Sequence, residues 1–376
     1  MPQKGDSSND SAFKHWINAS LVKRISSHVH HHYPDFDSKK FESLSLKLDA
    51  LELKARTRLI AQTLQAELPS DYLKALKVVL AAAKDPKPKV AGLSGFDLWP
   101  FTEFIQLHGL KNAEKSLEAL MELTQLFTAE FAVRPFLIHH QELSLKYLDK
   151  LTTHPVHHVR RWVSEGSRPR LPWGERLPFL VKDPTPSLKL LEKLKYDDEI
   201  YVRKSVANHL NDITKDNPAM VIKTLQRWNK EAPEKHQAKI TWITKHSLRG
   251  LIKKGHPDAL KLIGVNTKMD FKLRDFKLDK KSIKAGDKLH FNFEVQSKQK
   301  GLVVIDYVVH YRKARGEAGK IFKLSNKKLK AGEWLHIEKN HSFKPVTTRV
   351  LYPGIHHIEI LANGKSLGKL PFTLKL

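Results

Sequence analysis

Hydrophobic positions between about residue 38 and residue 263 recur at helical spacing. The segment FESLSLKLDALELKARTRLIAQTLQAEL carries apolar residues three to four positions apart, and DYLKALKVVLAAA repeats the pattern. Prolines and glycines, among them the prolines at 86 and 88, divide the region into segments of about 10 to 20 residues, which are ordinary helix lengths. The pattern predicts an array of helical hairpins.

A weak internal repeat supports this prediction. VRRWVSEG, which begins at Val159, aligns with VRKSVANH, which begins 43 residues later at Val202. A period of about 40 to 47 residues is typical of HEAT-type repeats, whose second helices line the inner surface of a curved solenoid. Chance similarity between two amphipathic basic helices is the alternative. Glu165 aligns with Asn208, so the repeat itself does not require an acid there.

After Gly264 the period of the pattern changes from 3.6 to 2. In KLHFNFEV, apolar residues alternate with polar ones, and the terminal LPFTLKL alternates in the same way. Pro353-Gly354 and Asn363-Gly364 are typical turn pairs, and the short strands recur at the spacing of a β-sandwich. We therefore expect a multidomain α-then-β chain. Residues 1–265 form an all-α HEAT-like-repeat solenoid, and residues 266–376 form a small immunoglobulin-like β-sandwich.

The charge of the chain predicts a polyanionic partner. The chain holds 66 Lys and Arg against 40 Asp and Glu, a formal net charge of +26. Residues 266–376 alone hold 24 basic and 10 acidic residues, so we expect the sandwich to contact phosphate as well, with the pairs Lys280-Lys281 and Lys327-Lys328 as candidate loop contacts. A membrane surface is less favoured, because no long basic amphipathic helix stands apart from the folded pattern.

No run of about 18 apolar residues and no secretory signal occurs, which predicts a soluble cytoplasmic protein associated with the nucleoid through DNA.

Several kinds of chemistry have no support in the sequence. The chain has no cysteine, which excludes disulfides, thiolate metal sites and cysteine nucleophiles. Histidines occur in adjacent pairs, but neighbours on a helix or strand point apart and no HExxH motif occurs, so we expect no metal site. GxGxxG, P-loop and GxSxG motifs are also absent, and we expect no cofactor.

The segment VRRWVSEGSRPRLPW, residues 159–173, carries the most informative chemistry. Glu165 lies between Arg160 and Arg161 on one side and Arg168 and Arg170 on the other. A carboxylate at a DNA-contacting surface would repel phosphate. The acid therefore either orients the arginines in structural ion pairs or serves a cationic substrate or transition state, and the residues alone leave both interpretations open.

Two further acids, Glu130 and Asp212, also stand near basic or aromatic residues. Glu130 and Arg134 are four positions apart, as are Arg161 and Glu165, so each pair can share one helix face. A single surface pair of this kind contributes only about 0 to 1 kcal/mol. Taken together, the acids could line one concave wall. Trp173, between Pro172 and Gly174, is a candidate for an exposed aromatic surface that faces a cation or a base.

These segments resemble AlkC-type DNA alkylation-repair glycosylases of the HEAT-like-repeat superfamily. The resemblance is carried by NASLVKRI, YPDFD, LDALELKAR, TAEFAVRPFL and above all VRRWVSEGSRPRLPW, and it extends from about Phe13 to Val265. An appended immunoglobulin-like domain also fits some members of the family. The resemblance implies a monofunctional glycosylase that removes cationic methylated bases, such as 3-methyladenine and 3-methylcytosine, without a deep pocket for a flipped base.

The resemblance also implies roles for individual residues. Glu130, Glu165 and Asp212 match the catalytic carboxylates, Trp173 matches an aromatic that faces the lesion, and Arg161 and Arg168 match positions that hold the DNA backbone. With the other basic positions of the repeat, the expected DNA-binding set is Arg160, Arg161, Arg168, Arg170, Arg203 and Lys204. The expected partner is double-stranded DNA with alkylated bases, bound by a monomer that needs no protein partner.

The chemistry agrees with these residue types. A base alkylated on a ring nitrogen already carries positive charge, so it can leave without a general acid while the sugar gains oxocarbenium character. Carboxylates then need only stabilise positive charge and position water. Nearby arginines should keep Glu165 ionised. Two alternatives are a non-catalytic HEAT-repeat scaffold, which leaves the three acids and Trp173 unexplained, and a metal-dependent nuclease, which has little support in the sequence.

Overall fold

The computed structural model describes residues 13–85, 91–346 and 349–376, and it divides into two compact units, residues 1–217 and 218–376. The first twelve residues of the predicted solenoid and the prolines at 86 and 88 lie outside the described residues. The last helix ends at Leu262 and the first strand begins at Phe271. The second unit therefore contains four helices as well as the strands, and the predicted division into residues 1–265 and 266–376 stays a proposal.

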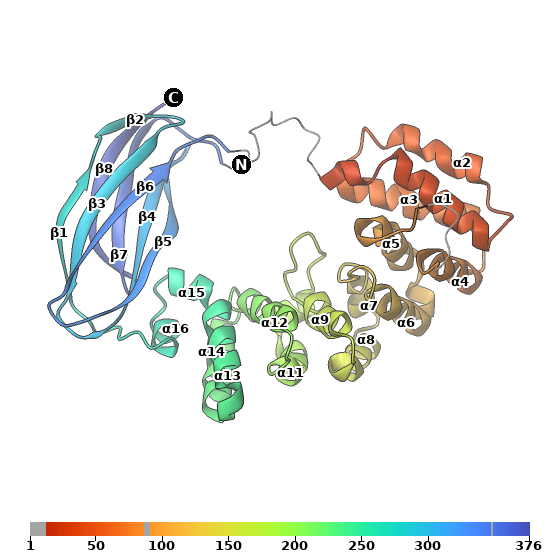
Figure 1. The fold of residues 1–376 in the computed structure, drawn as a ribbon, viewed down its shortest axis with the longest axis horizontal. Helices are drawn as coiled ribbons and strands as arrows, with labels where there is room; N and C mark the ends of the chain where they lie inside the picture. The colour runs from red at the N-terminus through yellow and green to blue at the C-terminus, as the bar shows by residue number, and fades with distance from the viewer. Residues whose placement is uncertain (1–12, 86–90, 347–348) are drawn as a thin grey trace. The chain divides into compact units, whose positions relative to one another are not determined.

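The first unit is helical throughout its described residues (Figure 1). Its α-helices are α1 Ala19–His32, α2 Ser38–Glu42, α3 Leu53–Glu67, α4 Tyr72–Ala83, α5 Trp99–His108, α6 Ala113–Leu123, α7 Arg134–His139, α8 Gln141–Lys150, α9 His157–Gly166, α10 Pro178–Lys182, α11 Thr185–Leu194 and α12 Ile200–Ile213. Short 3-10 helices lie at η2 Phe13–Trp16, η3 Ser43–Lys47, η4 Gly95–Leu98, η5 Leu110–Asn112 and η6 Leu151–Thr153.

Side chains at the N-terminal ends cap two of these helices. The Asn18 side chain accepts a hydrogen bond from the Leu21 amide at 3.0 Å and caps α1. The Asp71 carboxylate accepts one from the Lys74 amide at 2.8 Å and caps α4. The apolar faces then pack in pairs, α1 on α4 and α3 on α5. The prediction of helical hairpins is confirmed.

The 43-residue repeat is visible in the hydrogen bonds of α9 and α12, which pack against each other. Arg160 Nη1 donates to the carbonyl oxygens six and five positions before it, at 2.8 and 2.9 Å. Arg203, at the aligned position, donates to the carbonyl oxygens six and five positions before it, at 2.6 and 2.8 Å. The same side chain makes the same contact at the start of both helices, which is evidence against a chance alignment.

The second unit begins with helices and continues as a sandwich of two sheets (Figure 1). The helices are α13 Pro218–Glu231, α14 Glu234–Ser247, α15 Arg249–Lys253 and α16 Pro257–Leu262. The strands are β1 Phe271–Leu278, β2 Ser282–Lys284, β3 Lys288–Ser297, β4 Gly301–Arg312, β5 Glu317–Leu329, β6 Trp334–Ser342, β7 Gly354–Ala362 and β8 Lys365–Lys375. One sheet has the order β1-β3-β6 and the other the order β2-β8-β7-β4-β5, and among the strands of the described residues only the β2–β8 pair is parallel.

The apolar residues that alternate with polar ones in the sequence form the core of the sandwich. The four alternating apolar residues of β3 are fully buried, and they pack against residues of β4 and β7 from the facing sheet. Asn363 and Gly364, with φ values of 48° and 80°, form the two-residue turn between β7 and β8. The predicted sandwich is confirmed. Lys327 and Lys328 were expected on a loop, but they lie exposed on the edge strand β5, where the strand pairing with β4 extends further than the sequence indicates.

No helix within the described ranges is both long and apolar enough to cross a membrane.

Candidate active site

The three predicted catalytic acids come from three separate segments of the first unit. Glu130 lies in the turn before α7, Glu165 near the end of α9 and Asp212 near the end of α12. All three are buried, with exposed fractions of 7%, 6% and 2%. A buried carboxylate is costly unless it is paired and hydrogen-bonded, so the partners of these acids decide what the site can do.

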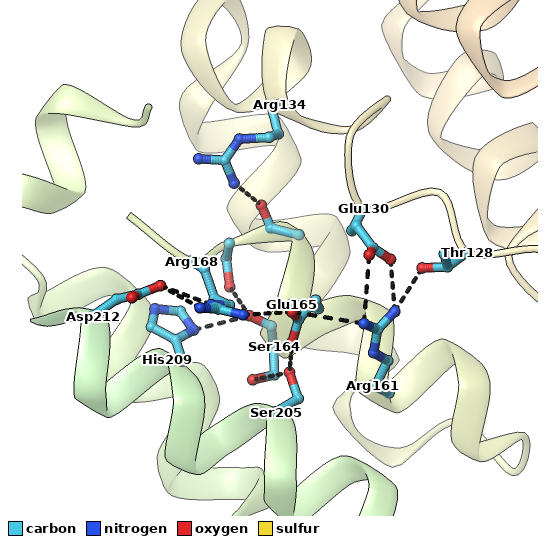
Figure 2. A network of polar contacts seen from close by, with 12 residues as sticks. Thr128, Glu130, Arg134, Arg161, Ser164, Glu165, Arg168, Ser205, His209 and Asp212 are labelled. Atoms are coloured by element: carbon cyan, nitrogen blue, oxygen red, sulfur yellow. Dashed lines mark hydrogen bonds and ion pairs between the residues drawn. The ribbon is translucent and has the colours of Figure 1, made fainter. Parts of the chain in front are cut away.

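Two arginines connect the acids into one chain of alternating charge (Figure 2). Arg161 Nη1 donates to Glu130 Oε2 at 2.6 Å, and Arg161 Nη2 lies 3.6 Å from Glu165 Oε1. Arg168 Nη1 donates to the same Glu165 oxygen at 2.6 Å, and Arg168 Nη2 lies 2.7 Å from Asp212 Oδ2. The order is acid, arginine, acid, arginine, acid. The acids and the arginines therefore hold one another in ion pairs, and Glu165 orients both Arg161 and Arg168, as the structural interpretation of VRRWVSEGSRPRLPW expects.

The second oxygen of Glu165 has its own partner. Ser205 Oγ donates to Glu165 Oε2 at 2.5 Å, across from α12 to α9. Since Arg168 donates to Oε1, each carboxylate oxygen of Glu165 receives a hydrogen bond, and the group is held in one orientation. Sequence reasoning missed Ser205. The repeat aligns Ser205 with Trp162, so the alignment contained no signal for a serine at this position.

A neutral histidine of α12 contacts the backbone of Ser164, the residue before Glu165. His209 is fully buried, and its Nδ1 lies 2.9 Å from the Ser164 carbonyl oxygen, to which it donates. Burial, together with the Arg168 charge, lowers the pKa of His209 to about 3. The ring is therefore neutral at physiological pH, and it helps to hold α9 against α12 without adding charge to the site.

Burial and charge act in opposite directions on the Glu130–Arg161 pair. Burial raises the pKa of Glu130 above its ordinary value, and the Arg161 charge only partly offsets this. For Arg161, burial alone would lower the pKa, but the charges of Glu130 and Glu165 raise it above the ordinary arginine value. Arg161 also donates to Thr128 Oγ1 at 2.6 Å. Arg161 is thus a permanent cation within reach of two of the acids.

The prediction that Glu130 and Arg134 share a helix face is wrong. Glu130 lies in a turn, and Arg134 is the first residue of α7. Arg134 donates instead to the carbonyl oxygen of Gly166 at 2.9 Å and to that of Glu175. Burial lowers the pKa of Arg134 to about 10. This buried cation joins the two ends of the loop that carries Trp173, a role that four-residue spacing could not indicate.

Trp173 lies where an exposed aromatic surface was expected. Its side chain is 62% exposed, and its φ of 64° is rare for a residue other than glycine. The Lys54 ammonium donates to the Trp173 carbonyl oxygen at 2.8 Å, and the Gly174 amide closes a turn onto Leu171 at 3.1 Å. Such a backbone conformation costs on the order of 1 to 3 kcal/mol and is often found at functional sites.

Most of the predicted DNA-binding residues also make contacts within the protein. Arg160 forms a two-pronged ion pair with Asp197 at 2.6 and 3.0 Å, and Arg170 forms one with Asp216 at 2.6 Å for both bonds. Arg203 donates to the carbonyl oxygens of Asp197 and Asp198 just before α12, whereas Lys204 is exposed on that helix. Contact of these side chains with DNA stays a prediction.

A small pocket opens beside Arg161. It is lined by residues 124–128, His158, Arg161 and Tyr201 and has a volume of ≈ 210 Å³. The Tyr201 ring lies 5.1 Å from the Arg161 guanidinium carbon. Small-molecule pockets usually measure about 300 to 1,000 Å³. The space next to the acids is therefore smaller than a typical ligand pocket.

Comparison with known proteins identifies relatives over nearly the whole chain. The alkylpurine DNA glycosylase AlkC of Pseudomonas fluorescens, solved bound to DNA containing an abasic site analog, superposes with a TM-score of 0.89 at 36% identity, covering 97% of this chain and 100% of that one. The uncharacterized protein YhaZ of Bacillus subtilis (strain 168) is 39% identical over 365 residues, 96% of this chain and 99% of YhaZ. Residues 272–376 match the family described as the C-terminal Ig-like domain of YhaZ. The resemblance inferred from the sequence motifs is confirmed, and the chain belongs to the AlkC family.

Proposed function

We propose that this protein is a monofunctional DNA glycosylase that hydrolyses the N-glycosidic bond of cationic alkylated bases, 3-methyladenine and 3-methylcytosine among them, in double-stranded DNA. The observation that supports this most is the buried chain of three carboxylates and two arginines, whose Arg168 shares a loop with the exposed Trp173, in a protein similar to AlkC over 97% of its length.

The charge of the site suits a cation. Glu130, Glu165 and Asp212 contribute three negative charges when ionised, and the two bridging arginines contribute two positive ones. Two further cations lie close to these acids: Lys215 reaches Asp212 at 2.8 Å from a half-exposed position, and the buried Arg134 interacts electrostatically with Asp212 and Glu165. A cationic base and an oxocarbenium-like sugar would supply positive charge close to these acids, where preorganised carboxylates stabilise it.

The reaction needs no acid and no cofactor. The C1′–N bond breaks, and its electron pair passes to the base, whose ring cation becomes neutral. Water adds to C1′ and gives up one proton, which a carboxylate or the solvent accepts. In this proposal Glu165 is the central group, because Arg168 and Ser205 hold both of its oxygens in place. Glu130 and Asp212 would add to the negative field on either side.

The geometry also supports recognition without deep insertion of the base. The pocket beside Arg161 is small, and Trp173 offers its ring at the surface of a loop held by Arg134. We propose that Trp173 contacts the damaged nucleotide where it lies and that Arg161 and Arg168 hold the backbone around it. Phosphate would then compete with Glu130 for Arg161.

Release of free base tests the function. Purified protein treated with EDTA is incubated with alkylated duplex DNA, and the soluble fraction is analysed for 3-methyladenine, 3-methylcytosine and 7-methylguanine. The proposal predicts release of the first two without added metal. A protein that binds the DNA but releases no base would be a scaffold, and strand cleavage that EDTA abolishes would indicate a nuclease.

A further inference from the structure

Three histidines at the end of α1 converge on Asp85, which follows the end of α4. His28 and His32 are one helical turn apart, so both rings point from the same face of α1. His28 Nδ1 lies 3.8 Å from Asp85 Oδ2, and His32 Nε2 lies 3.5 Å from the same oxygen. Ligand atoms of His31, His32 and Asp85 all lie within 4.8 Å of one another.

The two separations from Asp85 resemble those between metal ligands. A hydrogen bond between an imidazole and a carboxylate spans about 2.7 to 3.2 Å. Around a tetrahedral ion with bonds of about 2.0 to 2.2 Å, neighbouring ligand atoms lie about 3.3 to 3.6 Å apart. The distances from Asp85 to His28 and His32 are close to the second range and outside the first.

The burial of these side chains also supports a metal site. The side chains of His28 and Asp85 are only 2% and 4% exposed. Neither Nδ1 of His28 nor Nε2 of His32 has a hydrogen-bond partner among the described residues. Buried polar atoms are nearly always satisfied, and an ion would satisfy both nitrogens at once.

The orientation of the His28 ring also suits metal binding. Its other ring nitrogen, Nε2, lies 3.3 Å from the Ala91 carbonyl oxygen, to which it can donate. A proton on Nε2 leaves the lone pair of Nδ1 directed at Asp85. A hydrogen bond of this kind, from the nitrogen that does not bind the ion, orients most metal-binding histidines.

The backbone around the cluster favours a cation. Helix α1 ends at His32 and α4 ends at Ala83, two residues before Asp85. The last turn of a helix carries partial negative charge, and two such ends meet here beside a carboxylate. Asp85 lies more than 50 positions further along the chain, so no local histidine motif indicates that it joins this cluster.

We propose that His28, His31, His32 and Asp85 bind one divalent transition-metal ion, with zinc as the first candidate, and that the ion fastens the end of α1 to the end of α4. Three imidazoles and one carboxylate are a donor set of intermediate softness that suits zinc rather than magnesium or calcium. The acids of α9 and α12 take no part, so the ion is structural and base excision does not need it.

Metal titration of the full-length protein tests the site. After chelator treatment and dialysis, the protein is titrated with Zn²⁺ by calorimetry and with Co²⁺ by visible absorption. We expect one ion per chain, Co²⁺ bands of a four-coordinate site and a higher melting temperature with Zn²⁺ present, because binding to the folded state stabilises it. The double variant His28→Gln/His32→Gln should bind at least about tenfold more weakly, because changes even to second-shell partners cost about 10- to 100-fold.

Two further variants keep the result interpretable. His30→Gln is the matched control, because His30 is an exposed histidine of the same helix whose Nδ1 faces the Phe36 carbonyl oxygen at 3.2 Å, and its binding should be unchanged. Asp85→Asn keeps the size of the side chain and should weaken binding, with circular dichroism verifying the fold. Absence of stoichiometric binding by the unaltered protein would overturn the proposal, as would equal loss in His30→Gln.

Discussion

At the scale of single residues, the site depends on arginines that each serve two acids. Arg168 lies between Glu165 and Asp212 and is itself buried, whereas Arg170, two positions later, pairs with the half-exposed Asp216. The two arginines share a loop, and their partners lie near the end of α12 and just after it, so they allow comparison of a buried and a more exposed ion pair.

Replacing Arg168 by Met should destabilise the fold by about 3 to 5 kcal/mol, because two buried carboxylates lose their common partner. Arg170→Met should cost only about 0 to 1 kcal/mol, the usual contribution of an exposed pair. Urea unfolding of both variants gives the two free energies. Equal losses would mean that Arg168 does not compensate buried charge.

The sequence indicated which acids matter but not how they are paired. Glu165 and Arg161 are four positions apart on one helix, and spacing predicts their contact. The closer partner of Arg161 is Glu130, 31 positions away, and Glu165 is held by Ser205, 40 positions away. Such pairs depend on how the hairpins pack, which no local spacing rule contains.

At the scale of secondary-structure elements, the contact between α9 and α12 carries the site. The helical period of the sequence predicts these helices, and the 43-residue repeat places Arg160 and Arg203 at equivalent positions. The loop after α9 is different. Its shape depends on Arg134 from α7 and on Trp173 at positive φ, and neither has a sequence signature.

The α9–α12 contact should weaken in acid. Neutral His209 has a pKa of about 3 in the folded protein, against about 6.5 when unfolded, so the unfolded chain binds more protons between these values. The stabilisation is complete above pH 6.5 and is lost as the pH falls toward 3. Between pH 7 and pH 5 the loss should be about 2 kcal/mol from this residue.

Urea unfolding of the wild type and of His209→Gln at pH 7 and pH 5 measures this contribution. The variant should be less stable at pH 7 and should lose less stability on acidification. His341 in the sandwich, whose pKa burial lowers to about 4, contributes in the same direction in both proteins and therefore cancels in the comparison. An unchanged pH dependence in the variant would contradict a neutral buried His209.

At the scale of the whole molecule, the net charge of +26 and the AlkC relationship indicate DNA as the partner, and the three buried acids are the groups that we propose to face a cationic base within it. The order of a helical array followed by a sandwich is readable from the change of period near Gly264. The sequence does not indicate that α13 to α16 group with the strands. This grouping depends on contacts between distant residues, such as those of Leu260 and Val265 with Val304.

Lys327 and Lys328 test whether the sandwich contacts phosphate. Lysines on an edge strand also prevent edge-to-edge association, so their exposure alone does not decide between the two roles. If both contact phosphate, Lys327→Gln/Lys328→Gln should reduce the slope of log K against log salt concentration by about 2, since each contact contributes about 0.9. Fluorescence anisotropy over a salt series measures the slope, and an identical slope would leave the pair with the edge-protecting role alone.

The central claim is that buried carboxylates, and Glu165 above all, promote departure of a cationic base. Single-turnover release of 3-methyladenine from duplex DNA by the wild type and by Glu165→Gln, with DNA binding measured in parallel, tests it most directly. The variant should bind DNA and release base slower by about 100-fold or more, the scale of losing one preorganised electrostatic group. An unchanged rate of release by Glu165→Gln would contradict the account.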